Sequence, residues 1–189
     1  MGAEGTKNLE AFLKKFGKSV VRNSRRRLKK EKGNTNLSKS IKYKVEEKKG
    51  NLNVTFSMDK YGPFLDKGVK GKNPSNISPN AKIKGQQAPK SPYKFGSGTK
   101  RGTFKQFVKK MAVFAQKKNI RFRQGKTGKF AKGNYQSIGY IIASNIYNRG
   151  LKPTMFFSKP FGQAMKTYAK KASEAIAKDI EESLRGKKK

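Results

Sequence analysis

Residues 61–71 read YGPFLDKGVKG and combine residue types that rarely meet in a linker. The apolar side chains favour burial; they are Tyr61, Phe64, Leu65 and Val69. The glycines permit backbone turns; they are Gly62, Gly68 and Gly71. We expect a short buried turn in which Asp66 faces a lysine or a cluster of backbone N–H groups. The alternative is a strand-to-helix corner that packs and does nothing else.

The sequence before this stretch predicts a helix followed by a β-hairpin. Apolar residues recur at three- and four-residue steps over residues 7–30, which predicts an amphipathic helix. Residues 41–45 and 52–58 alternate apolar and polar side chains, and a hydrophilic turn containing Gly50 separates them. Because an isolated hairpin is marginally stable, we expect helices or further strands to cover its apolar face.

The sequence after residue 102 predicts mainly helices. The expected helices span residues 103–118 and 135–148, with Thr103 and Gly150 at their boundaries, and a short strand spans 151–157. A long final helix with an apolar stripe should start near Ser158 and run to about residue 185. We therefore predict an α+β fold in which a small antiparallel hairpin sheet is covered by an N-terminal and a long C-terminal helix. Residues 1–189 should form a single domain.

Two basic insertions interrupt this pattern. Residues 72–102 contain four of the seven prolines and lack periodicity, which predicts an extended loop or arm. Residues 119–133 form a second basic loop. Its candidate anion or nucleic-acid contacts are Arg121, Arg123, Lys126 and Lys129. Further candidates end the first helix: Arg25, Arg26, Arg27, Lys29 and Lys30. This RRRLKK run is either a solvated helix end or a patch that binds phosphates or acids.

The charge balance points to an anionic partner. The chain has 47 lysines and arginines against eleven acids, for a formal net charge of +36. Such a chain repels itself when alone and should be stabilised by nucleic acid, an acidic protein surface or an anionic membrane. No apolar run approaches the roughly 20 residues of a membrane span, so we expect no membrane insertion.

The residue types argue against an enzyme. The absence of cysteine and histidine excludes the common zinc sites and the Ser-His-Asp and Cys-His arrangements. The acids show no converging cluster for metal catalysis, so we expect no catalytic, metal or cofactor site. Aromatics stand among bases at 93–96 and 121–123, as in platforms that bind single-stranded nucleic acid, but the strand pattern of an RNA-recognition sheet is missing.

Two segments together resemble a known family. The first is YGPFLDKGVKG, and the second is GLKPTMFFSKPFGQAM at residues 150–165. They resemble the tail-component or tail-completion proteins at the head–tail junction of tailed bacteriophages. In that family the first motif reads Tyr, an apolar pair, an acid and Gly, and the second reads Pro-x-Pro-Phe before a small residue. The matching positions here are Tyr61, Phe64, Leu65, Asp66, Gly68, Pro153, Phe156, Phe157 and Ala164.

The resemblance covers roughly the first 70 and the last 45 residues and implies a structural role. Members of the family form rings or line the neck and have no known catalytic residues. The resemblance thus implies a homo-oligomeric ring in the virion, in contact with portal, connector or tail proteins and with packaged DNA as a possible further partner. The alternative from the charge is a non-enzymatic nucleic-acid-binding protein.

Overall fold

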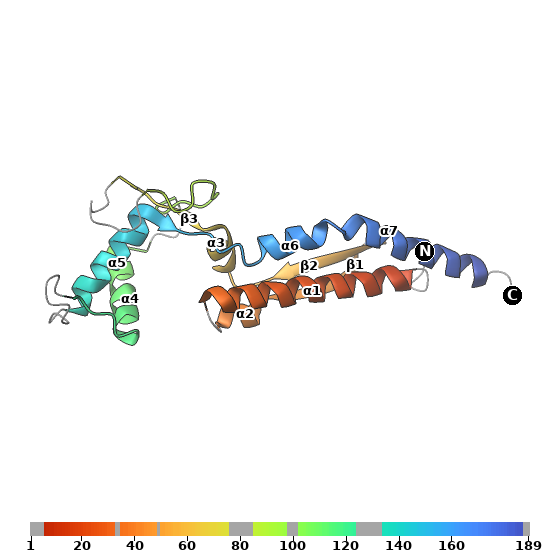
Figure 1. Cartoon of the computed structure of the whole chain (residues 1–189), viewed down its shortest axis with the longest axis horizontal. Helices are drawn as coiled ribbons and strands as arrows, with labels where there is room; N and C mark the ends of the chain where they lie inside the picture. The colour runs from red at the N-terminus through yellow and green to blue at the C-terminus, as the bar shows by residue number, and fades with distance from the viewer. Residues whose placement is uncertain are drawn as a thin grey trace. The chain divides into compact units, whose positions relative to one another are not determined.

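The computed structural model describes residues 6–32, 35–48, 50–75, 85–97, 102–123 and 134–186. Helices and small antiparallel strand pairs make up the chain (Figure 1), which confirms the α+β class. Contacts divide the chain into two compact units, where the sequence predicted a single domain. Unit 1 consists of Met1–Asp66 and Thr154–Lys189, and unit 2 consists of Lys67–Pro153. The chain therefore leaves unit 1 once and returns to it once.

Unit 1 holds the hairpin and most of the helices. Its elements are α1 (Lys7–Lys32), α2 (Asn36–Ser40), β1 (Lys42–Lys48), β2 (Asn51–Ser57), α3 (Gly62–Lys67, whose last residue begins unit 2), α6 (Ser158–Met165) and α7 (Tyr168–Gly186). The β1 and β2 strands pair antiparallel from Lys42↔Ser57 to Lys48↔Asn51, which confirms the predicted hairpin. Phe56 on β2 packs edge-on against Phe16 of α1 and Phe161 of α6, so both helices cover the hairpin.

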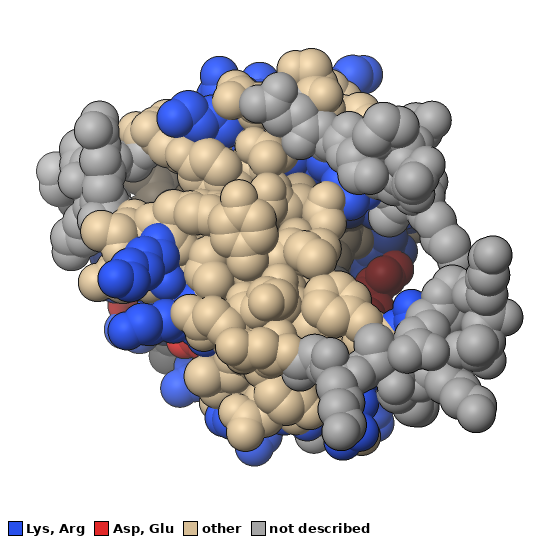
Figure 2. Space-filling view, turned by 90° about the vertical axis from the view of Figure 1, so that its left-hand side faces the viewer, with Lys and Arg blue, Asp and Glu red and all other residues tan. Residues whose placement is uncertain are grey.

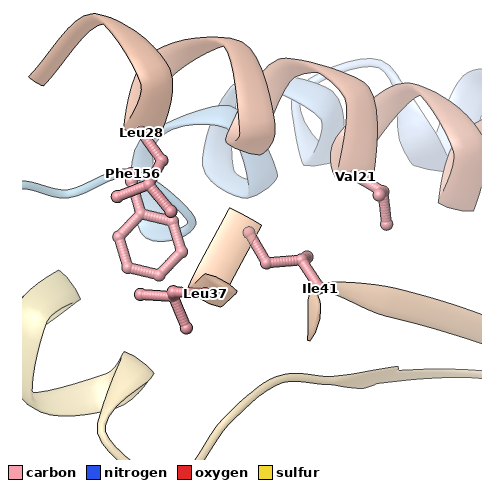
Figure 3. Packing of buried hydrophobic residues seen from close by; sticks show 5 residues of the cluster. All are labelled: Val21, Leu28, Leu37, Ile41 and Phe156. Atoms are coloured by element: carbon pink, nitrogen blue, oxygen red, sulfur yellow. The ribbon is translucent and has the colours of Figure 1, made fainter. Parts of the chain in front are cut away.

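The core of unit 1 is assembled from both ends of the chain. Its central cluster, drawn in Figure 3, consists of Val21, Leu28, Leu37, Ile41 and Phe156. Phe156 is fully buried although it comes from the second part of unit 1. Full burial of one such side chain contributes about 1.5–3 kcal/mol relative to exposure. The returning segment is therefore an integral part of the unit 1 core.

The predicted long final helix is two helices. The α6 helix ends at Met165 and α7 begins at Tyr168. Between them, Thr167 Oγ1 donates to the Ala164 carbonyl at 3.5 Å, a back-bonding contact that bends helices. The start was predicted near Ser158, and Ser158 is the first helical residue, with Phe157 at the cap position.

The predicted strand over residues 151–157 is also shorter in the structure. Only Gly150–Leu151 forms a strand, β4. Met155 has a φ of 50°, which is outside the extended region, so the segment cannot continue as a strand.

Unit 2 is built on a helix pair beside a minimal strand pair. Its elements are β3 (Val69–Lys70), α4 (Phe104–Lys117), α5 (Tyr135–Arg149) and β4 (Gly150–Leu151). The predicted cap of α4 is confirmed, because Thr103 and Gln106 form a reciprocal capping box. The two helices approach closely at Gly139, where an added Cβ would lie 2.6 Å from the Ala112 nitrogen.

Part of the predicted 72–102 arm is tied into unit 2. Ser91 Oγ donates to the Gly68 carbonyl at 2.7 Å, and Phe95 N donates to the Lys70 carbonyl at 2.9 Å. Gln87 N donates to the Arg149 carbonyl at 2.9 Å. Residues 85–97 therefore lie along β3 and the end of α5, because their polar groups satisfy backbone groups there. Residues 76–84 and 98–101 are outside the described residues.

Candidate functional site

The two segments that carry the family resemblance meet at Asp66. Asp66 lies in the last turn of α3 and is only 4% exposed. Its Oδ1 accepts hydrogen bonds from Phe157 N at 2.7 Å and from Ser158 N at 3.1 Å, and its Oδ2 accepts one from the Ser158 hydroxyl. The carboxylate thus sits at the N-terminus of α6, where N–H groups lack helical partners and negative charge is stabilised. The prediction of a buried Asp66 facing backbone N–H groups is confirmed.

The backbone of α3 adds a second connection between the same segments. Thr154 donates to the Leu65 carbonyl through both its backbone N, at 3.1 Å, and its Oγ1, at 2.9 Å. Met155 N donates to the Asp66 carbonyl at 3.0 Å. The last carbonyls of a helix lack intrahelical partners, so these bonds satisfy α3 from a distant part of the sequence.

The glycine that follows Asp66 continues this pairing inside unit 2. Gly68 has a φ of +71°, and an added Cβ would lie 2.4 Å from the Leu151 carbonyl oxygen and 2.8 Å from Pro153 N. Position 68 therefore requires glycine both for its backbone conformation and for the close approach of the returning chain. Val69 then pairs with Leu151 in the β3–β4 ladder.

Not every motif residue is buried as its apolar character predicted. Tyr61 is 50% and Phe64 is 44% exposed, so the expectation of burial is wrong for both. The physical reason is that a helix as short as α3 turns one side inward, and that side carries Leu65 and Asp66. In the second segment, Phe157 stacks on Phe161 with ring centroids 5.7 Å apart.

The structure divides the basic run at the end of α1 into two groups. Arg25 Nη2 donates to the Ile41 carbonyl at 2.8 Å, and Arg27 Nε donates to the Thr154 carbonyl at 3.1 Å. These two guanidinium groups therefore brace the fold of unit 1. Like Arg25, the other three side chains are exposed to solvent: Arg26, Lys29 and Lys30.

Only part of the second basic loop is described. Arg121 and Arg123 are exposed, and Arg121 Nε donates to Asn119 Oδ1 at 3.0 Å. Lys126 and Lys129 lie outside the described residues. The candidate anion contacts of this loop belong to unit 2, whereas those of α1 belong to unit 1. The basic residues predicted to contact anions are therefore divided between the two units.

A buried acid that sequence reasoning missed repeats the arrangement of Asp66. Asp179 of α7 accepts hydrogen bonds from Asn8 N at 2.7 Å, Leu9 N at 2.9 Å and Asn8 Nδ2 at 3.0 Å. Burial raises the pKa of Asp179, but the hydrogen bonds from Asn8 and Leu9 outweigh it, so the pKa lies below its ordinary value. The available signal was the position of Asp179 between Ile176 and Ile180 in an apolar stripe.

The apolar stripe of α7 is itself largely exposed. Ile176, Ile180 and Leu184 are 43%, 49% and 63% exposed. Together with Thr6 and Leu9 they line a groove of about 390 Å³. The sequence pattern correctly predicted an apolar stripe on this helix. Within the part of unit 1 that the structure describes, much of the stripe is exposed to solvent.

Unit 2 also exposes uncharged side chains, on the α4–α5 pair. Phe104, Tyr140 and Ile141 are exposed and line a groove of about 530 Å³ between the helices. Figure 2 shows a broad surface free of lysine, arginine and acidic side chains. The groove itself is lined mainly by uncharged side chains, with Lys105 at one position.

The acids are distributed unevenly between the units. Residues 67–153 contain 21 of the 47 lysines and arginines and none of the eleven acids. An acid count by segment would have revealed this from the sequence. Every lysine and arginine of unit 2 therefore lacks an acidic side chain within its own unit.

Two negative structural findings and the comparisons complete the description. Among the described residues, no three acids lie close enough together to hold a metal ion, and no helix is long and apolar enough to cross a membrane. Comparisons of the chain with protein-family models, curated proteins and solved structures found no match.

Proposed function

We propose that the protein is a structural subunit of a bacteriophage virion at the head–tail connector, a ring subunit of the neck or tail-completion region that acts by assembly. The observation that carries the proposal is the junction at Asp66, through which YGPFLDKGVKG is hydrogen-bonded to GLKPTMFFSKPFGQAM. The two segments that carry the family resemblance are 91 residues apart at this contact. The contact joins the two segments in one structural feature, as a shared family motif would require.

The α7 helix offers a surface through which copies could associate. It carries four acids and four bases, so it is formally neutral in a chain of net charge +36. Like-charged subunits repel most where lysines face each other, and least where the facing surface is neutral. Burial of Ile176, Ile180 and Leu184 against a second copy would remove apolar area from water, which favours association. We therefore assign the contact between neighbouring copies to α7.

The location can be tested directly on particles. Electron microscopy of phage particles that contain this chain, with the chain labelled by antibody, should place it between portal and tail. Consistent labelling at any other position, or particles that lack the chain, would remove the proposal.

The assembly contact can be tested in solution with one variant and a matched control. We expect native mass spectrometry to find a discrete oligomer of the purified chain. Ile180→Asp should shift this oligomer to monomer, because it places a charge in the apolar stripe. Lys178→Asp introduces the same residue at an exposed position outside the stripe and should leave the oligomer intact. Equal effects of the two variants would contradict the assignment to α7.

A further inference from the structure

The complete segregation of acids away from unit 2 has a physical consequence for that unit. In unit 1, Glu46 bridges Lys48 at 3.1 Å and Glu10 bridges Lys14 at 2.7 Å. Unit 2 cannot form such pairs, since residues 67–153 have 21 bases and no acid. A compact unit of 87 residues has a radius of gyration of roughly 12 Å. This is comparable to the screening length of about 8 Å at physiological salt, so repulsion inside the unit persists.

Four exposed lysines of α4 carry part of this charge. The side of α4 that contacts α5 carries Val108, Ala112 and Ala115, which are buried. The exposed lysines lie at the edge of this side or away from it; they are Lys105, Lys109, Lys110 and Lys117. The helix has 14 residues, so it is about 21 Å long. Duplex DNA carries one negative charge per about 1.7 Å of its axis, and so presents about 12 charges over this length.

The aromatic side chains of unit 2 decide how nucleic acid could be contacted. Phe95 packs against Phe107 and Tyr147, with ring centroids 6.3 and 5.7 Å apart. Phe104 packs edge-on against Tyr147 at 5.6 Å. The rings of Phe95, Phe107 and Tyr147, which are engaged with one another, do not offer a stacking platform for unpaired bases. The exposed lysines reach phosphates, and such contacts hold a duplex without selection of bases.

We propose that unit 2 binds the phosphate backbone of duplex DNA, with the exposed lysines of α4 as contacts. An acidic protein surface fits less well, because protein surfaces intersperse both signs of charge whereas a duplex presents one sign throughout. The α1 lysines of unit 1 are not part of this site. The assignment goes beyond the proposed assembly role and does not depend on it.

The test compares two variants of the full chain that lose the same charge. The site variant is K105Q/K109Q/K110Q/K117Q on α4, and the control is K15Q/K18Q/K29Q/K30Q on exposed positions of α1. Fluorescence anisotropy with a mixed-sequence 30-bp DNA duplex would give the dissociation constant from 50 to 300 mM NaCl. Each lost phosphate contact makes the slope of log affinity against log salt concentration shallower by about 0.9. The site variant loses four lysines, so its slope should be shallower than that of the wild type by about 3.6. At 100 mM salt its affinity should fall by on the order of 10²–10³-fold.

The controls separate a site from general basicity. In the α1 variant, the slope of log affinity against log salt concentration should change by less than about 0.9, the value for one phosphate contact. A variant with arginine at the four α4 positions should bind like the wild type, because it keeps the charge. Equal losses in the α4 and α1 glutamine variants would overturn the proposal, as would poly-glutamate competing as well as the duplex at matched charge. These outcomes are independent of where the chain lies in a particle, so they test this inference apart from the proposed function.

Discussion

Removal of the Asp66 carboxylate should destabilise unit 1 by opening the junction between its two chain segments. In Asp66→Ala, Phe157 N and Ser158 N lose their acceptor at the start of α6, and the Ser158 hydroxyl loses its own. A hydrogen bond to a charged group contributes about 1.5–3 kcal/mol, and loss of a helix cap costs about 0.5–2 kcal/mol. These contributions overlap, and water can reach the exposed Ser158 once the carboxylate is gone. We therefore expect a loss of about 2–3 kcal/mol in the free energy of unfolding.

The assay is urea unfolding followed by circular dichroism, with Glu174→Ala as the matched control. Glu174 is exposed on α7, and its loss removes the same charge from a basic chain. The control should change stability by no more than about 0.5 kcal/mol, as surface substitutions usually do. An unfolding midpoint of Asp66→Ala that coincides with the wild type would refute the reasoning, because the junction would then contribute nothing to folding.

A double-mutant cycle can locate the effect at α6. Ser158→Ala removes the hydroxyl donor to Asp66 and leaves the backbone donor in place. Groups in direct contact show interaction energies of about 0.5–3 kcal/mol, whereas distant groups are additive within about 0.5 kcal/mol. The cost of the double variant should therefore be smaller than the sum of the two single costs. Strict additivity would show that Asp66 stabilises the fold through other partners.

Three further substitutions test separate contacts of unit 1. Gly17→Ala places a Cβ 2.3 Å from the Tyr43 ring, so it should lower the free energy of unfolding by about 1–2 kcal/mol, measured by thermal unfolding. In Gly162→Ala the added Cβ meets no atom within 4 Å, so this control should raise the free energy of unfolding by about 0.5–1 kcal/mol. Phe156→Ala should cost about 3–5 kcal/mol in urea unfolding, because its side chain is fully buried in the core. Because its folded pKa is lowered, Asp179 stabilises unit 1 above its unfolded pKa of about 3.9, and this stability is lost as pH falls through the folded value. The stability difference between wild type and Asp179→Asn should therefore be largest above about pH 5 and should disappear as the pH falls through the folded pKa of Asp179. A difference in stability that does not change with pH would contradict the role of the carboxylate.

Local patterns predicted most elements because the relevant signals are local. The hairpin follows from period-two alternation, and α1, α4 and α5 follow from three- and four-residue periodicity. The cap of α4 was predicted from Thr103. This was possible because a cap is local: its partner, Gln106, lies only three positions further along the chain. Such signals need no knowledge of the rest of the chain.

The junction could be predicted only in part, because its partners are distant in sequence. The expectation that Asp66 would meet N–H groups followed from the cost of burying a charge. Which N–H groups it meets depends on a contact across 91 residues that leaves no periodic trace. The exposure of Tyr61 and Phe64 could not be inferred either, because the length of α3 decides which side chains face inward.

The division of charge shows why a whole-chain average is a poor guide to partners. In unit 1 three of the acids make defined contacts: Asp66 and Asp179 cap α6 and α1, and Glu46 bridges lysines of the hairpin. The first two occupy helix N-termini, where negative charge stabilises a fold. Unit 2 instead caps its helices with neutral groups, Thr103 on α4 and Asn134 on α5. Its uncompensated positive charge is therefore available for a partner outside the unit, which the charge of +36 taken over the whole chain does not reveal.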